Sequence, residues 1–467
     1  MAHSESPLGL FAAKMRTAGL STPAIRQFKH NYENLLAGQS GFIAEAEIQA
    51  IESLPNFESI PEPGPLAANL LQQTVVLKLN GGLGTGMGLE KAKSLLVVKD
   101  GLTFLDFIAR QILWARKRHN VPLRFLLMNS FSTSHDTLEF LTKYPELGTP
   151  RELELLQSQV PKVNAATLEP ATWPQNPSLE WCPPGHGDLY PSVLASGSLD
   201  RLLGVGVRYL FVSNSDNLGA SLDVKLLNHF ASSNAPFLME VARRTASDRK
   251  GGHLARRNGR FLLRESAQCA PEDQAAFQDI ERHRFFNTNN LWIRLDALKS
   301  LLETSGGFVP LPLIKNAKTL DPRDKNSPPV FQLETAMGAA IESFEGAGAI
   351  VVPRSRFAPV KTTSDLLALR SDAYEVTEDW RVALAKRENS SSPTIELDAT
   401  YYKNIDQLEA ALAGGVPSVR DCSELVVRGP IQFNSGVAFR GKVSVKTNSV
   451  TPQPLPPGEY VNRTVQI

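Results

Sequence analysis

A glycine-rich segment followed by a lysine has the clearest chemical potential in this chain. Five glycines fall within the eight residues from Gly81 to Gly88, directly after a short apolar run. Because glycine has no Cβ atom, backbone N–H groups there can approach a ligand closely, and successive N–H groups form a concave anion site. Lys93 lies near enough in sequence to add a full positive charge. We therefore predict a phosphate-binding loop.

Two common phosphate-binding patterns do not fit this segment. A P-loop reads GxxxxGK followed by Ser or Thr, and no glycine here precedes a lysine in that pattern. The dinucleotide pattern GxGxxG begins with Gly84 and Gly86, but Leu89 occupies the place of its last glycine. A flexible turn without a ligand is the alternative interpretation, and the well-patterned segments on both sides favour a binding loop.

A second polar cluster follows the apolar run at residues 209–212. It reads Ser213-Asn214-Ser215-Asp216-Asn217. Taken alone, such a cluster after a strand is more often a turn than a ligand site.

The elements that position these loops alternate along the chain. Residues 74–79, 123–128 and 209–212 are short apolar runs typical of buried strands, and a helix should begin after Thr103 with Asp106 completing its cap. Strand, polar loop and helix in alternation predict an α/β fold with a mainly parallel or mixed sheet. Ligands in such sheets gather beyond the carboxyl ends of the strands, where both polar loops lie.

The last part of the chain changes character. Two apolar registers each recur every six residues, namely Leu425, Ile431, Val437 and Val443, and Val427, Phe433, Phe439 and Val445. This period predicts a β-helix that turns a corner every hexapeptide, with an antiparallel hairpin as the alternative. We expect a helical N-terminal region at 1–70, a central α/β domain at 71–372 and a β-helix domain at 373–467.

Composition narrows the function further. The chain has 467 residues, with 49 Lys and Arg against 48 Asp and Glu, so the net charge is +1. Such a balance lacks the electrostatic footprint of a nucleic-acid binder. Three scattered cysteines and no long apolar stretch predict a cytoplasmic protein without a membrane span.

The glycine-rich segment resembles the signature loop of the eukaryotic-type UTP–glucose-1-phosphate uridylyltransferases, also called UDP-glucose pyrophosphorylases. Further blocks match the family in order, at residues 183–188, 211–219, 250–252, 286–292, 316–320 and 353–363. The resemblance implies a Rossmann-like nucleotidyltransferase core and a C-terminal left-handed β-helix. It also implies UTP and glucose 1-phosphate as substrates and Mg²⁺ as the cofactor.

The same resemblance implies the site residues. Those expected to contact substrate are Leu79, Asn80, Gly81, Gly82, Lys93, Gln157, Gly185, His186, Asn214, Ser215, Asp216, Asn289 and Lys361. Lys93 and Lys361 would be catalytic by neutralising phosphate charge, and Asp216 would hold the metal. Gln157 would read uracil, since an amide offers both a donor and an acceptor.

The remaining roles concern the uridine and the sugar. Gly185 is expected near the uridine, His186 near the sugar phosphate and Asn289 on the glucose hydroxyls. Many relatives have proline before the loop lysine, where this chain has Ala92. The C-terminus differs from relatives that assemble into octamers, so we expect a monomer or small homo-oligomer.

Two other functions remain open from the sequence. A related enzyme could act on N-acetylglucosamine 1-phosphate or on several sugar phosphates. A non-catalytic nucleotide-sensing protein could use the same fold, although such a protein would be free to lose Lys93, Asp216 and Lys361.

Overall fold

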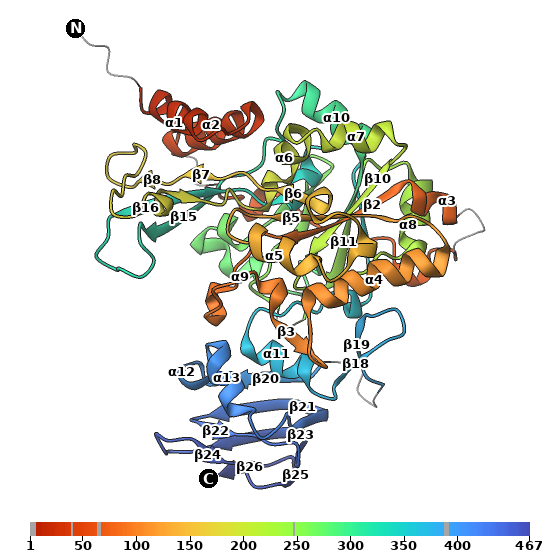
Figure 1. The fold of residues 1–467 in the computed structure, drawn as a ribbon, viewed down its shortest axis with the longest axis vertical. Coiled ribbons are helices and arrows are strands. Elements are labelled where there is room, and N and C mark those ends of the chain that lie inside the picture. Colours follow the sequence, from red (N-terminus) through yellow and green to blue (C-terminus); the bar gives the residue numbers. More distant parts are fainter. Residues whose placement is uncertain (1–5, 39–40, 63–66, 246–247, 387–391) are drawn as a thin grey trace.

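The computed structural model describes residues 6–38, 41–62, 67–245, 248–386 and 392–467. Within these residues, ten strands form one mixed sheet at the centre of the molecule (Figure 1). Four neighbouring strands run parallel in the order β10 (Tyr209–Asn214), β2 (Thr74–Asn80), β5 (Arg124–Asn129) and β6 (Glu154–Leu156). The predicted α/β fold and its three buried strands are confirmed.

The other strands of this sheet extend it on the opposite side of β10. Its neighbour β14 (Phe285–Arg294) pairs antiparallel with β10, so the sheet is mixed. The sheet continues through β11 (Phe237–Arg243), β17 (Gly348–Val351), β12 (His253–Arg257), β13 (Arg260–Arg264) and β1 (Gln49–Ala50).

Helices cover both faces of the sheet. In β2, Val75 and Leu77 pack towards α6 (Leu189–Ala195), α7 (Ser198–Gly204) and α10 (Leu295–Thr304), which lie above the sheet in Figure 1. Val76 packs on the other face with α4 (Phe104–His119) and α8 (Val224–Ser233). Burial on both faces explains why the strand is a continuous apolar run. The predicted cap is present, since Thr103 Oγ1 accepts from the N–H of Asp106 at 3.1 Å.

The N-terminal region contains a short strand as well as helices. Helices α1 (Pro7–Thr17) and α2 (Thr22–Leu36) confirm its helical character. The short strand β1, however, joins the edge of the central sheet by pairing with β12, which the sequence did not predict.

The C-terminal strands pair in parallel. They are β20 (Thr394–Leu397), β21 (Ser418–Arg428), β23 (Val437–Lys446), β25 (Gly458–Val461) and β26 (Thr464–Gln466). Leu425 lies opposite Val443 and Val427 opposite Val445, a separation of three hexapeptides (443 − 425 = 18). All eight residues of the two predicted registers are buried. This pairing excludes the antiparallel hairpin. Strands β21 and β23 are each longer than one hexapeptide. The ladder between them continues across two shifts of register.

The remaining elements connect these parts. The helices are α3 (Ala67–Gln72), α5 (Ser134–Leu141), α9 (Gln274–Phe277), α11 (Thr363–Arg370), α12 (Ala399–Tyr402) and α13 (Ile405–Ala411). The strands are β3 (Val97–Lys99), β4 (Leu102–Thr103), β7 (Val160–Pro161), β8 (Val163–Asn164), β9 (Trp181–Cys182), β15 (Ile314–Thr319), β16 (Pro329–Glu334), β18 (Tyr374–Val376), β19 (Val382–Leu384), β22 (Ile431–Gln432) and β24 (Gln453–Pro454).

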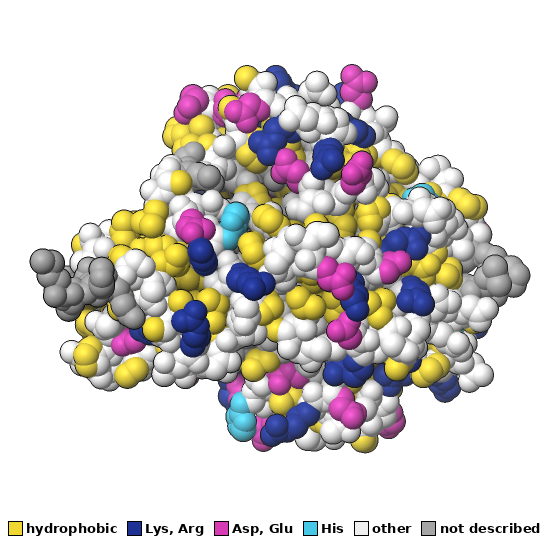
Figure 2. Space-filling view, turned by 90° about the horizontal axis from the view of Figure 1, so that it is seen from above, with side chains coloured by type: hydrophobic (Ala, Val, Ile, Leu, Met, Phe, Trp, Pro, Cys, Tyr) yellow, Lys and Arg dark blue, Asp and Glu magenta, His cyan; other side chains and the backbone are white. Residues whose placement is uncertain are grey.

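The surface carries both signs of charge. Figure 2 shows Lys and Arg side chains interspersed with Asp and Glu over one face of the molecule. Among the helices that the structure describes, none has the length and apolar character needed to cross a bilayer.

Candidate active site

The polar loops meet at one edge of the central sheet. β2, β10, β5 and β6 are parallel neighbours, so their carboxyl ends lie together: Leu79 is opposite Asn214, and Asn80 is opposite Asn129. Gln157 follows β6, and its N–H donates to the carbonyl of Asn129 at 2.7 Å. Chain segments far apart in sequence therefore converge where an α/β sheet binds its ligands.

A cavity of about 350 Å³ opens at this edge. Its size suits a small-molecule ligand. Ten of the predicted substrate-contacting residues line it, namely Leu79, Gly81, Gly82, Lys93, Gln157, Gly185, His186, Asn214, Ser215 and Asp216.

Two glycines of the loop have different surroundings. A Cβ atom on Gly81 would lie 2.8 Å from Gln157 Oε1, which is too close. A Cβ atom on Gly82 would meet nothing within 4 Å, so this residue leaves space at the cavity wall. The loop then turns back, and the N–H of Lys93 donates to the carbonyl of Gly82 at 3.1 Å. This bond fixes the lysine beside the loop amides.

Lys93 and Asp216 form an ion pair inside the cavity. Lys93 Nζ lies 2.6 Å from Asp216 Oδ2, and the two side chains are only 15% and 19% exposed. The other carboxylate oxygen, Asp216 Oδ1, is buried and has no hydrogen-bond partner among the described residues. An ionised carboxylate oxygen can only accept, so this atom is suited to a donor or a cation.

The loop at residues 185–188 forms the opposite wall. Gly185 has a φ of +80°, and a Cβ atom there would lie 2.4 Å from the carbonyl oxygen of Thr335, so only glycine fits. Gln157 Nε2 donates to the carbonyl of Gly185 at 2.7 Å and joins two walls of the cavity. Asp188 is buried and accepts from the N–H of Ser158 and from Ser192 Oγ.

His186 is held in one orientation. Its Nδ1 accepts from the N–H of Met337 at 3.1 Å, which assigns the ring proton of the neutral imidazole to Nε2. Burial lowers the pKa of His186 to about 4, so the ring is neutral at physiological pH. It can therefore offer Nε2–H as a donor without carrying charge.

Three predicted residues lie outside the lining. Asn80 turns its amide away from the cavity to donate to Asn129 Oδ1 and Thr137 Oγ1, at 2.7 and 3.0 Å. Asn289 supports the lining instead, by donating to Asn214 Oδ1 at 2.9 Å. Lys361 is exposed on a neighbouring loop.

The loop of Lys361 is nevertheless attached to the site. The N–H of Val360 donates to the carbonyl of Asp216 at 3.2 Å, and Pro359 forms an isolated bridge with Asn217. The backbone next to Lys361 is thus bonded to the residue predicted to hold the metal.

The cavity also contains residues that sequence reasoning did not single out. They are Met128, Pro183 and Glu334. Met128 ends a predicted strand and Pro183 belongs to a matching block, so both carried a positional signal. Glu334 ends β16, far from the other lining residues in sequence, and nothing local indicated its role. Burial raises its pKa.

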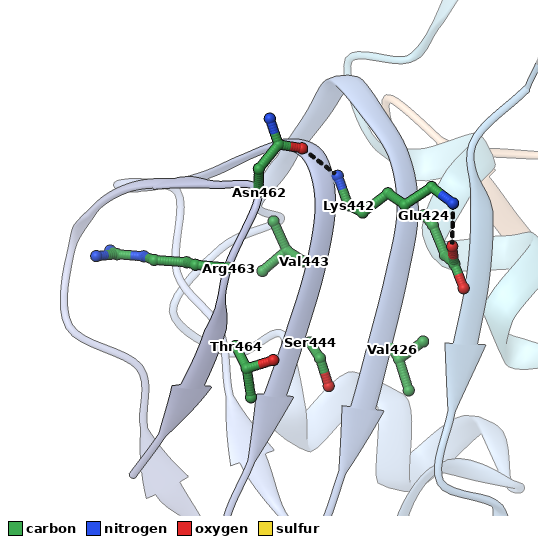
Figure 3. Close-up of a pocket in the computed structure, with 8 residues that line it drawn as sticks. All are labelled: Glu424, Val426, Lys442, Val443, Ser444, Asn462, Arg463 and Thr464. Atoms are coloured by element: carbon green, nitrogen blue, oxygen red, sulfur yellow. Dashed lines mark hydrogen bonds and ion pairs between the residues drawn. The ribbon is translucent and has the colours of Figure 1, made fainter.

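A second, shallower pocket of about 270 Å³ lies on the C-terminal strands (Figure 3). There Lys442 Nζ lies 3.5 Å from Glu424 Oε2, and the Lys442 N–H donates to Asn462 Oδ1 at 2.9 Å. None of its lining residues was predicted to bind substrate, so the cavity at the sheet edge is the candidate active site.

Comparison with known proteins places the chain in a family. The model of the family described as UTP–glucose-1-phosphate uridylyltransferase matches residues 25–440. The chain belongs to this family. The uridylyltransferase of Solanum tuberosum is 39% identical to it, over 96% of this chain and 98% of the relative.

Solved structures related to this uridylyltransferase chain cover nearly all of it. A substituted UDP-glucose pyrophosphorylase from Leishmania major, solved in complex with UDP-glucose, has a TM-score of 0.95 and 46% identity, with 99% of each chain covered. A UDP-glucose phosphorylase from Trypanosoma brucei has a TM-score of 0.92 and 49% identity, also with 99% of each chain covered.

Proposed function

We propose that this protein catalyses the reversible transfer of the uridylyl group from UTP to glucose 1-phosphate, which yields UDP-glucose and pyrophosphate. Family membership gives the reaction class, and the observation that carries the proposal is the convergence of the loop amides, Lys93 and Asp216 in one cavity. Relatives that share most of the chain's length bear the name of this activity.

The chemistry needs positioning more than proton transfer. A phosphate monoester has a second pKa near 6, so the sugar phosphate is mostly ionised at pH 7 and attacks the α-phosphorus without a general base. The barrier lies in bringing two polyanions together in line. In this proposal, the loop amides at Gly81 and Gly82 bind phosphate oxygens, and Lys93 and Lys361 neutralise the charge that moves to pyrophosphate.

His186 acts as a neutral donor in this scheme. Its Nε2–H can donate to an oxygen of the sugar phosphate, because the bond from the Met337 N–H to Nδ1 places the ring proton on Nε2. A neutral donor orients that phosphate without holding it as tightly as a cation would.

The residues present fit a divalent cation. Asp216 Oδ1 is a buried acceptor without a partner among the described residues, and hard cations prefer carboxylate and phosphate oxygens. We assign Mg²⁺ to Asp216, where the bound ion would neutralise phosphate charge. Lys93 would then exchange its bond to Asp216 for one to the UTP phosphates.

Base and sugar recognition follow from two amides. Gln157 Nε2 donates to the carbonyl of Gly185, so its Oε1 is the atom assigned to accept from the N3–H of uracil. Cytosine has no hydrogen on N3 and would not make this bond. Asn289 adjoins Asn214 at the cavity edge and is assigned to glucose hydroxyls.

The proposal extends to the architecture. We assign a Rossmann-like nucleotidyltransferase domain to residues 71–372 and a left-handed β-helix to 373–467, since parallel pairing three hexapeptides apart suits a three-sided coil. Residues 1–70 form the N-terminal region. A monomer or small homo-oligomer is expected, and sedimentation would show it.

A direct assay tests the function. Purified protein is supplied with UTP, Mg²⁺ and, in separate reactions, glucose 1-phosphate, galactose 1-phosphate and N-acetylglucosamine 1-phosphate, and released pyrophosphate is measured. Glucose 1-phosphate should give the fastest turnover. Faster turnover of another sugar would reassign the substrate, and no turnover with any of them would refute the proposal.

A further inference from the structure

A buried lysine lies directly beneath the candidate site. Lys78 is the fifth residue of β2, it is 1% exposed, and its side chain extends into the interior rather than into the cavity. Lysine is almost never fully buried unless it is paired, because its ammonium group loses its hydration. A leucine would fill this strand position without that cost, which suggests that the ammonium group has a task.

The ammonium group joins the end of strand β10 to the loop that follows it. Lys78 Nζ donates to Ser213 Oγ at 2.8 Å and to the carbonyl of Ala220 at 2.6 Å. Ser213 stands opposite Lys78 in the β2–β10 register, one residue before the end of β10, and Ala220 lies in the loop that leads from β10 to α8. Between these anchors lie Asn214, Ser215 and Asp216, which line the cavity.

The same loop supports the segment that carries Lys361. Asn217 Nδ2 donates to the carbonyl of Arg356 at 3.0 Å, and Asn217 Oδ1 accepts from the N–H of Ala358 at 3.1 Å. A Cβ atom on Gly219 would lie 2.2 Å from the carbonyl oxygen of Ser355, so the two loops touch through their backbones. A shift of residues 214–220 would therefore displace residues 355–361 as well.

The groups around Lys78 act on its charge in opposite directions. Arg356 pairs with Glu240 through Nη2 at 2.8 Å, and Glu240 is fully buried. Burial, followed by the charge of Arg356, lowers the pKa of Lys78 to about 7, while Glu240 and Asp216 act in the opposite direction.

We propose that Lys78 is a positioning residue for nucleotidyl transfer, which clamps the 214–220 loop through Ser213 and Ala220 and thereby sets the positions of Asp216 and the Lys361 segment. This inference rests on the proposed function for its kinetic consequence, but the clamp itself is a structural claim that can be tested without turnover.

The principal variant is Lys78→Met, which keeps the length and apolar stem of the side chain and removes its donors. The control is Lys162→Met. Lys162 is also buried, at 3% exposure, and also donates to a backbone carbonyl, but its partner Leu320 is not in the 214–220 loop and does not line the cavity. Ser213→Ala, a milder variant, removes one anchor only.

Hydrogen exchange measures the clamp directly. Amides of residues 214–220 should exchange at least about tenfold faster in Lys78→Met than in the natural chain, and should be unchanged in Lys162→Met. Kinetics measure the consequence: kcat should fall by about 10²-fold, the usual penalty for a misplacement near 1 Å, with KM for UTP changed by less than about threefold. Adding Ser213→Ala to Lys78→Met should change kcat by less than about twofold, because the bond from Lys78 to Ser213 Oγ is 2.8 Å long and the remaining contact of that hydroxyl, with the carbonyl of Ala220, is a long 3.4 Å.

Three results would overturn the clamp. They are unchanged exchange of 214–220 in Lys78→Met, equal effects of Lys78→Met and Lys162→Met, or independent multiplying effects of Lys78→Met and Ser213→Ala. If Lys78→Met does not fold, Ser213→Ala decides: faster exchange with a lower kcat supports the clamp, and no change in either refutes it. Absence of turnover in the natural chain would instead refute the proposed function, and the exchange result would still stand.

Discussion

A defined share of the acid sensitivity of the fold should be traceable to one buried histidine, His253. His253 in β12 is fully buried, and its ring stacks on that of His283, with centroids 3.8 Å apart, and packs against Phe277. Neither ring nitrogen of His253 has a hydrogen-bond partner among the described residues. Burial, followed by the charges of His283 and Arg244, lowers the pKa of His253 to about 2.

The sign and size of the effect follow from linkage. In the unfolded chain a histidine binds its proton near pH 6.5, whereas His253 in the folded protein does so only near pH 2. Unfolding therefore takes up a proton between these values, and folded-state stability falls as the pH drops below about 6.5. At pH 5 the loss from this one residue is about 2 kcal/mol, at about 1.36 kcal/mol per pH unit; at pH 7 it is close to zero.

The test compares urea unfolding at pH 7 and pH 5 for the natural chain and His253→Phe. A phenyl ring preserves the contact with Phe277 and loses no hydrogen bond. The free energy of unfolding of the variant should fall by about 2 kcal/mol less between these pH values than that of the natural chain. His135→Gln, which changes an exposed histidine of α5, is the control and should behave like the natural chain. Equal losses in His253→Phe and the natural chain would refute the reasoning.

Four further changes test separate parts of the structure. Lys361→Ala should lower kcat by about 10²–10³-fold with an unchanged circular dichroism spectrum; near-natural kinetics would remove this lysine from the site. Gly185→Ala should raise the Kd for UTP at least about tenfold in calorimetry, since its Cβ would lie 2.4 Å from the carbonyl oxygen of Thr335, and unchanged binding would contradict that geometry. Ala92→Pro should raise the unfolding free energy by about 0.4–1 kcal/mol because φ at Ala92 is already −50°; destabilisation would show that the loop cannot accept proline. Deleting residues 425–467 should cause aggregation on gel filtration by exposing Tyr402 and Leu408, and a monodisperse product would count against this packing.

Features encoded locally were predictable from the sequence. The glycine loop, the cap at Thr103 and the six-residue period near Leu425 each depend on neighbouring residues, and the structure contains all three. The glycine loop and the loop after β10 fall at one sheet edge because they follow parallel strands, whose carboxyl ends point the same way.

Features set by distant partners were not predictable. Strand β1 is two residues long and exists because β12 lies beside it. Glu334 reaches the cavity through the packing of Thr335 against Gly185. Lys78 stands in an apolar run, and its function depends on Ser213 and Ala220, which only the folded chain brings to it.

The most direct test of the central claim follows oxygen atoms through the reaction. Glucose 1-phosphate carrying ¹⁸O in its three terminal phosphate oxygens is incubated with UTP, Mg²⁺ and the protein, and the products are examined by ³¹P nuclear magnetic resonance and mass spectrometry. If the sugar phosphate attacks the α-phosphorus of UTP, all the label stays in UDP-glucose, including the oxygen that bridges its two phosphates, and pyrophosphate is unlabelled. Label in pyrophosphate, or an unlabelled bridge, would contradict the account.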